Sequence, residues 1–582
     1  MDGMLPLFSV RGSEGLLLKE WCLTNKELTT HIKLCEKPTK IIAFSSDGQI
    51  FVWCDGVNIY VYQISTKSII HSFIVPRAYD VSFSPLGDLF CTWEPYAVTK
   101  ENPSGSNNCK LWNIEDGECV FSYVQKKKNC WEPVWLKGTH NLGRLVGSSV
   151  HFFQDNNFGK IVQKMHMDKL ESFKVSPNSQ PPHRVACFIR GAKGAPSSVR
   201  VFEYPKFSAD DVVANKSFFK ADSVDILWNN RGTELLVKTT VDVDTTGESY
   251  YGEQSLHYMS ASGETAIVSL SKKGPIYDAK WSPNSNQFCV VFGFMPAKAC
   301  IFNRKCNMIF EFSPTPKNEC FYNPQGNLLV LAGFGNLRGN IEIWDCDRKK
   351  QVSQYTSPDT TLFEWCSDGV HFLTATTAPR LRVSNGYKLW HYLDGVLYEE
   401  SVSTELHQVL WQPKPEGTYP VPVIKDVSKS DLMSKVKADT PTAYVPPHAR
   451  GKTEYTAAKE RFVKDDDAPV TPENHSKAAQ KNKKKRENKK KAGAPPPNLT
   501  NEQQDVVQMA KYLLTDSSIP QPTSESTNPN DKKIKNLKKK LQAIEKLKQQ
   551  QAQGKELEKN QVEKLKTEDS LLQELSQLQL KS

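Results

Sequence analysis

The amino-acid sequence predicts an all-β propeller of nine blades, followed by a disordered basic tail with short α-helices and a C-terminal αα-hairpin. Three observations predict this fold class. A strand pattern recurs nine times before residue 412, all 12 tryptophans and all 14 cysteines lie in the same part of the chain, and most of the net positive charge lies beyond it. The predicted parts are a propeller over 1–425, a linker over 426–498, a short helix over 499–515, a second linker over 516–530 and a helical hairpin over 531–580.

Each predicted blade begins with an alternating strand that ends in a bulky anchor residue and runs into a polar turn. The anchors lie 39 to 53 residues apart, at Phe44, Phe83, Trp135, Val175, Trp228, Trp281, Tyr322, Trp365 and Trp411. A second strand with an aromatic residue at or next to its end follows most of them, as in 58–62 and 341–345. Four short strands in roughly 40–45 residues are typical of a propeller blade, because one sheet buries both of its faces only when blades stack. We therefore expect the anchors to pack between neighbouring blades.

The ninth anchor, Trp411, is followed by few residues with a strand pattern, so its blade needs strands from elsewhere. The apolar segments Leu7–Val10 and Leu16–Leu18 near the N-terminus are candidates. We expect an N-terminal strand to close the ring, because closure removes the exposed edges of the first and last blades.

Signatures of catalysis, metal binding and membrane insertion are missing from the sequence. The 14 cysteines include no Cys-x-x-Cys pair, which argues against zinc and against a disulfide framework. Gly451-Lys452-Thr453 imitates the end of a P-loop, but Pro446 stands where the first glycine is needed. The first residues lack the pattern of a signal peptide, and no apolar run approaches 18 residues. We expect a cytoplasmic binding protein with no enzymatic activity, no cofactor, no metal and no membrane contact.

The charge of the chain is concentrated after the predicted propeller. From Asp426 onward there are 31 lysines and arginines and 22 acidic residues, whereas the first 425 residues are almost neutral. The densest basic segment spans 477–491, and its candidate RNA-binding residues are Lys481, Lys483, Lys484, Lys485, Arg486, Lys489, Lys490 and Lys491. It has no interleaved aromatic residue, so we expect contact with phosphates rather than with bases. A solvated run or a nuclear localisation signal is the alternative reading.

Residues 531–580 have a helical pattern interrupted near Gly554. Apolar residues recur on one face of each predicted helix, which favours an αα-hairpin. Lys532, Lys535, Lys539 and Lys546 share the opposite face of the first helix and are candidate ribosome-binding residues. Such a stripe is explained equally well by solubility alone.

Six strings in the propeller region are distinctive: Lys193–Ser197, Asn215–Asp222, Tyr250–Gln254, Gly293–Ala299, Leu331–Gly339 and Ala378–Val383. They resemble the eukaryotic translation initiation factor 2A family. The predicted hairpin, with Lys532–Leu541 and Leu557–Gln561, is also similar to the ribosome-binding end of the Mago-binding factor PYM.

The resemblance implies a nine-bladed propeller, similar to that of the b subunit of initiation factor 3. It also implies a translation initiation factor that binds the small (40S) ribosomal subunit, works with mRNA and other initiation factors, and brings initiator methionyl-tRNA without GTP on selected messages or under stress. Two alternatives stay open at this point. One is a ribosome-bound scaffold that never holds tRNA, and the other is a general scaffold that the basic run directs to the nucleus.

Overall fold

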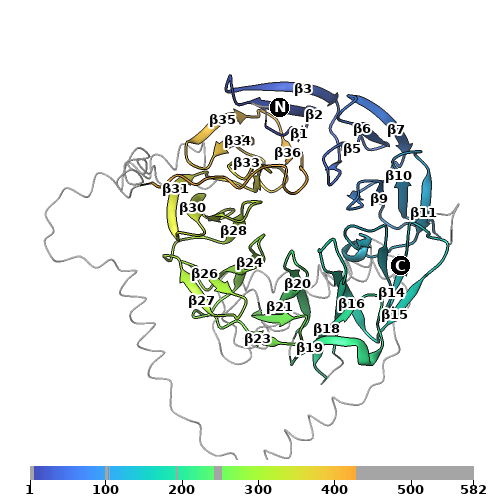
Figure 1. Cartoon of the computed structure of the whole chain (residues 1–582). Helices are drawn as coiled ribbons and strands as arrows, with labels where there is room; N and C mark the ends of the chain where they lie inside the picture. Colours follow the sequence, from blue (N-terminus) through green and yellow to red (C-terminus); the bar gives the residue numbers. More distant parts are fainter. Residues whose placement is uncertain are drawn as a thin grey trace, which may run out of the picture. The chain divides into compact units, whose positions relative to one another are not determined.

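The computed structural model describes residues 5–98, 103, 105–191, 195–219, 221–241 and 252–427. Over these residues, 36 strands form nine four-stranded antiparallel sheets arranged as blades around a ring (Figure 1). The predicted nine-bladed propeller is therefore confirmed. The predicted linkers, short helix and hairpin of 428–582 lie outside the described residues, and the domain boundary at residue 425 stays a prediction.

The four strands of each sheet occupy equivalent positions from the centre of the ring to its rim (Figure 1). The innermost strands are β4 (Ile41–Phe44), β8 (Asp80–Phe83), β12 (Val134–Trp135), β16 (Leu170–Val175), β20 (Ser223–Trp228), β24 (Ile276–Trp281), β28 (Glu319–Tyr322), β32 (Leu362–Trp365) and β36 (Leu406–Trp411). The second strands are β5 (Ile50–Cys54), β9 (Leu89–Trp93), β13 (Leu142–Val146), β17 (Arg184–Ile189), β21 (Glu234–Val241), β25 (Gln287–Phe292), β29 (Leu328–Ala332), β33 (His371–Thr376) and β1 (Phe8–Gly12).

The outer half of each sheet is built in the same way. The third strands are β6 (Asn58–Gln63), β10 (Cys109–Asn113), β14 (Ser149–Phe153), β18 (Ser197–Glu203), β22 (Glu253–Ser260), β26 (Lys298–Asn303), β30 (Asn340–Asp345), β34 (Gly386–His391) and β2 (Gly15–Cys22). The outermost are β7 (Ser68–Ile74), β11 (Cys119–Tyr123), β15 (Gln163–His166), β19 (Val212–Phe218), β23 (Thr265–Ile267), β27 (Met308–Glu311), β31 (Lys350–Thr356), β35 (Gly395–Ser401) and β3 (Glu27–Cys35). Two short 3-10 turns, Lys128–Cys130 and Ala209–Asp211, lie in connections.

Every predicted anchor is the last residue of an innermost strand. Three tryptophan anchors also link neighbouring sheets, because each indole donates a hydrogen bond to the backbone carbonyl just before the previous anchor. The Nε1–O distances are 3.4 Å from Trp228 to Lys174, 2.9 Å from Trp281 to Leu227 and 3.3 Å from Trp365 to Phe321. The anchors thus pack between blades, as expected.

In six of the nine blades the residue after the anchor is a serine or asparagine, a short polar residue that can hold the turn to the second strand. Ser45 Oγ accepts a hydrogen bond from the Ile50 backbone N–H at 2.9 Å, and Asn323 Oδ1 accepts one from Leu328 at the same distance. Both polar side chains are fully buried and gain from having a partner. Gly48 completes the first of these turns with a φ of +70°, a left-handed conformation that favours glycine.

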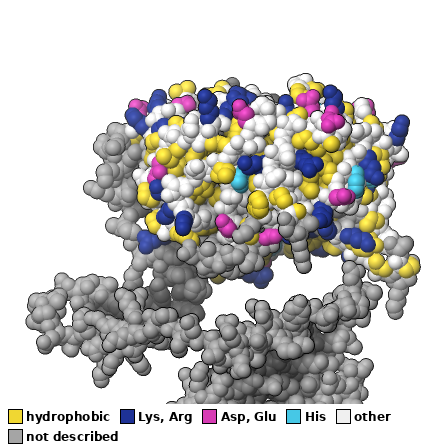
Figure 2. Space-filling model, turned by 90° about the horizontal axis from the view of Figure 1, so that it is seen from below, with side chains coloured by type: hydrophobic (Ala, Val, Ile, Leu, Met, Phe, Trp, Pro, Cys, Tyr) yellow, Lys and Arg dark blue, Asp and Glu magenta, His cyan; other side chains and the backbone are white. Residues whose placement is uncertain are grey.

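The second and third strands are buried, whereas the outermost strands form the solvent-facing wall of the ring. The second strand β29 is buried at every position, while the outermost strand β7 is mostly exposed or half-buried. Figure 2 views the ring edge-on from the side of β23 and β27 and shows hydrophobic side chains between charged ones on this wall. The core therefore lies between the blades rather than at the rim.

The ring is closed by strands from the two ends of the propeller, as predicted. β36 pairs with β1, with Phe8 opposite Trp411 and Val10 opposite Val409, and β1 continues into β2 and β3. The Phe8 ring is fully buried and lies 5.3 Å from the Trp411 ring and 5.8 Å from that of Tyr387 in the neighbouring blade. N-terminal and C-terminal strands therefore share one hydrophobic core.

A carboxylate in the blade next to the closing blade also contacts the closing strand β36. Glu364 Oε2, on β32, accepts a hydrogen bond of 3.0 Å from the Trp411 backbone N–H. Burial raises the pKa of the Glu364 carboxyl to about 7, and the hydrogen bond from Trp411 acts in the opposite direction. A carboxyl whose pKa is higher in the folded than in the unfolded chain stabilises the fold at low pH, and this stability is lost as pH rises from about 4.5 to about 7.

We therefore expect Glu364→Gln to stabilise the ring at pH 8 and to have little effect at pH 4.5. The amide keeps an acceptor for Trp411 but carries no charge to bury, and the gain should not exceed about 3 kcal/mol. Denaturant unfolding at the two pH values measures the difference. Glu416→Gln, at an exposed carboxylate, is the control, and an equal gain from Glu364→Gln at both pH values would contradict the prediction.

Candidate nucleic-acid interface

The ring has two faces that differ in charge. One face, here the basic face, is formed by the connections from second to third strands and from each outermost strand to the next innermost strand. Its described connections carry nine acidic residues and fourteen basic ones: Lys37, Lys40, Arg77, Lys126, Lys127, Lys128, Lys169, Arg190, Lys272, Lys273, Lys317, Arg338, Arg380 and Arg382. On the opposite face, the described connections carry ten basic and twelve acidic residues. The basic face is therefore the better match for a polyanion.

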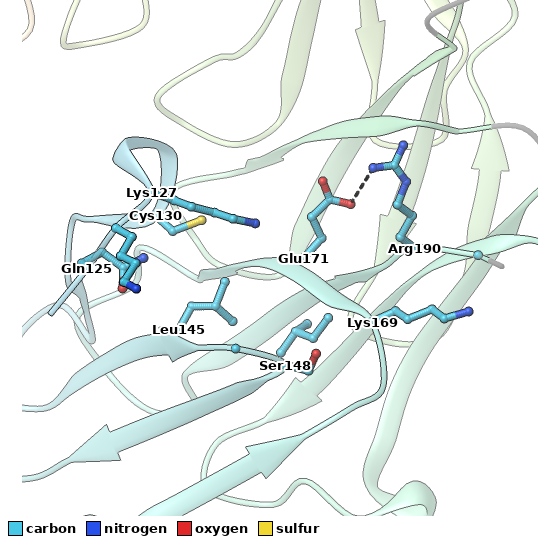
Figure 3. A pocket seen from close by; sticks show the side chains of 12 residues that line it. Gln125, Lys127, Cys130, Leu145, Ser148, Lys169, Glu171 and Arg190 are labelled. Atoms are coloured by element: carbon cyan, nitrogen blue, oxygen red, sulfur yellow. Dashed lines mark ion pairs between the residues drawn. The ribbon is translucent and has the colours of Figure 1, made fainter. Parts of the chain in front are cut away.

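A cavity of about 600 Å³ opens on the basic face across the sheets that begin with β12 and β16. Lys126 and Lys127 line it from the β11–β12 connection, Lys169 from the β15–β16 connection, and Arg190 from the β17–β18 connection. Figure 3 shows the Lys127 side chain extending toward Glu171, with Arg190 on the far side of that carboxylate. The lining of this cavity thus holds four cationic side chains and a single carboxylate.

The ion pairs in this cavity are long. Arg190 Nη1 lies 3.8 Å from Glu171 Oε2, and Arg190 Nη2 lies 3.6 Å from Asp222 Oδ1. Neither distance is a normal hydrogen bond, so the guanidinium keeps donors that an anionic ligand can use. The Arg190 side chain is also about half exposed, which leaves it accessible from solvent.

Cys130 is the one thiol that lines this cavity. Burial raises the pKa of the Cys130 thiol, while the neighbouring Lys127 acts in the opposite direction. A protonated thiol is a poor nucleophile, and no lining residue of this cavity is a histidine. The arrangement is suited to binding an anion.

Aromatic side chains lie beside the lysines that flank the cavity. Lys128 Nζ is 4.2 Å from the ring centroid of Tyr79, and Lys126 Nζ is 4.8 Å from that of Tyr96. Tyr79 is 55% exposed, although a large aromatic side chain is normally better buried. Cations interleaved with exposed aromatic rings are typical of surfaces that bind single-stranded nucleic acid.

All predicted site residues lie outside the described residues, so their roles stay predictions. They are Lys481, Lys483, Lys484, Lys485, Arg486, Lys489, Lys490, Lys491, Lys532, Lys535, Lys539 and Lys546.

The basic face is not evident from the sequence alone, because its residues are scattered along the chain. The signals that point to it are the triplet Lys126-Lys127-Lys128 and the location of the family-like strings. Gly293–Ala299, Leu331–Gly339 and Ala378–Val383 each overlap a connection between a second and a third strand. These strings therefore belong to the basic face.

Comparisons with known proteins agree with the propeller fold, and they match residues of the tail as well as of the propeller. A family model described as "Eukaryotic translation initiation factor eIF2A" matches residues 216–409, and one described as "Eukaryotic translation initiation factor 2A C-terminal domain" matches residues 532–578. Eukaryotic translation initiation factor 2A of Drosophila melanogaster is 35% identical, with 99% of each chain covered. The chain belongs to the eukaryotic translation initiation factor 2A family. The Saccharomyces cerevisiae factor 2A is 30% identical, with 86% of this chain and 88% of that protein covered.

Membership of the factor 2A family gives the chain a role in translation initiation, with the translation machinery in general as its partner. A solved structure entitled "Crystal structure of the eukaryotic initiation factor" is 30% identical, with a TM-score of 0.65, and covers 71% of this chain and 100% of its own. The resemblance to the factor 2A family is therefore confirmed in sequence and in fold.

The described part of the chain contains no helix that is long and apolar enough to cross a membrane.

Proposed function

We propose that this member of the factor 2A family binds the small (40S) ribosomal subunit and promotes GTP-independent delivery of initiator methionyl-tRNA on selected mRNAs or under stress. The observation that carries the proposal is the match to factor 2A relatives along the whole chain, tail included. The basic face adds support, because tRNA, mRNA and ribosomal RNA are all polyanions. The factor acts in the cytoplasm, beside other initiation factors, without cofactor or catalytic step.

The tail supplies two further contacts in this proposal. The eight basic residues of 481–491 bind RNA phosphates, and Lys532, Lys535, Lys539 and Lys546 bind a shaped site on the small subunit. The second of these groups falls inside the region matched by the C-terminal family model, which spans residues 532–578.

A competing function is a ribosome-associated scaffold that recruits other factors without holding tRNA. The propeller fold supports this scaffold function, because a propeller offers a large rigid surface for protein partners.

Two measurements on the full-length protein test the proposal. Cosedimentation with purified small subunits in a sucrose gradient should place the protein in the subunit peak, and filter binding should retain labelled initiator tRNA in the absence of GTP. Cosedimentation without tRNA retention would favour the scaffold. Absence from the subunit peak would refute both ribosomal functions.

A further inference from the structure

Phe219 is an exposed aromatic residue beside the basic cavity. Its side chain is 95% exposed, whereas the preceding Phe218 is buried and packs edge-on against His257 at a ring distance of 4.8 Å. Two consecutive phenylalanines therefore face opposite environments at the end of β19. Phe218 is part of the hydrophobic core, whereas the Phe219 side chain has no packing role in that core.

Three contacts tie the Phe219 loop to the cavity wall. Ser197 Oγ donates a hydrogen bond of 2.9 Å to the Ala221 carbonyl, and the same oxygen accepts one of 3.0 Å from the Gly191 N–H. Arg190 Nη2 lies 3.6 Å from Asp222 in that loop. Since Arg190 and Gly191 both line the cavity, the loop that carries Phe219 borders it.

The charge of the cavity selects the class of ligand. The cavity lining contains four cationic side chains, Lys126, Lys127, Lys169 and Arg190, and a single carboxylate, Glu171, so it is strongly cationic. An acidic peptide would match the positive charge of the cavity but would make no use of the exposed Phe219 ring. A nucleic-acid strand offers both phosphates for the cations and flat bases for the ring. Only an unpaired base can stack on a side chain, because bases in a duplex are already stacked on one another.

We propose that this cavity and Phe219 form a binding site for single-stranded RNA. Backbone phosphates lie among Lys127, Lys169 and Arg190, and one unpaired base stacks on the Phe219 ring. The site rests on the proposed function, since it names the form of RNA that the basic face takes. It differs in kind from the proposed tail run, which has no aromatic residue and binds phosphates alone.

The test uses the full-length chain in which the eight basic residues of 481–491 are replaced by glutamine, so that the tail does not mask the propeller. Fluorescence anisotropy measures binding of a labelled short uridine oligomer across a salt series. Phe219→Ala should weaken binding roughly ten- to hundred-fold, because stacking of one base is lost, and Phe219→Tyr should retain it. Lys127→Gln and Arg190→Gln should each flatten the dependence of log affinity on log salt by about 0.7.

Two controls separate stacking from other effects. Lys305→Gln removes an exposed cation from the opposite face and should leave binding unchanged. An abasic oligomer keeps the phosphates without the bases, so its binding should not respond to Phe219→Ala. Because Phe219 is almost fully exposed, the melting temperature of this variant should match that of the parent chain.

The inference is overturned if Phe219→Ala binds the uridine oligomer as tightly as the parent, or if it weakens the abasic oligomer equally. It is also overturned if Phe219→Ala reduces only small-subunit cosedimentation, since the ring would then contact protein. Failure of the unmodified full-length protein to cosediment with small subunits would count against the proposed function and leave the oligomer result standing.

Discussion

Replacing Phe8 by alanine should lower the free energy of unfolding of the ring by about 4 kcal/mol, the usual cost of removing a buried phenylalanine ring. Phe8 is fully buried on β1 and packs edge-on against Trp411 and Tyr387, which belong to two adjacent blades. The cavity left behind would weaken the contact that joins the first and last parts of the propeller. A large effect is expected because no other described sheet combines strands from the two ends of the propeller.

Denaturant unfolding followed by tryptophan fluorescence measures this effect. All 12 tryptophans precede residue 412, so the signal reports on the propeller without contribution from the tail. Ile74→Ala is the matched control, because Ile74 lies on the outermost strand β7 and is 77% exposed. Its effect should stay within about 0.5 kcal/mol, as is usual for surface substitutions. Equal destabilisation by both variants would show that β1 does not hold the ring closed.

Replacing the eight basic residues of 481–491 by glutamine should produce the largest change in RNA binding. Each phosphate contact on a single strand contributes about −0.7 to the slope of log affinity against log salt. If half of the eight side chains contact phosphate, the slope should flatten by about 3, and affinity at low salt should fall by several orders of magnitude. Filter binding of tRNA across a salt series measures this change, while small-subunit cosedimentation should be partly spared.

The helical hairpin predicted over 531–580 should show the opposite pattern. Leu541→Pro should reduce small-subunit cosedimentation more than tRNA binding, because proline in a helix interior costs roughly 3 kcal/mol and would misplace the lysines on its face. Leu541→Ala keeps the helix propensity and serves as the matched control. If neither the glutamine variant nor Leu541→Pro weakens either interaction, the tail does not bind, and the propeller must carry both.

The sequence by itself determined the repeat, the number of blades and the way the ring closes. Each anchor, from Phe44 to Trp411, ends an innermost strand, because alternation, a bulky last residue and a polar turn are local properties of a few consecutive residues. The fifth complete blade along the chain, β20 to β23, has a weaker local signal in its sequence. Its third strand, β22, ends in Tyr258-Met259-Ser260, so the aromatic lies two residues before the strand end, whereas it is the last or second-to-last residue of the other third strands.

Only the tertiary structure decided which residues form the cavity on the basic face. Lys127, Lys169 and Arg190 come from three different connections, and only Lys127, inside a run of three lysines, stands out in its own segment. The ring places equivalent connections of successive blades next to one another, so residues about 20 to 60 positions apart converge. The same holds for Phe219: the sequence shows two adjacent phenylalanines, and the end of β19 decides that one is buried and the other faces solvent. Burial and convergence depend on how whole blades pack, which no local pattern encodes.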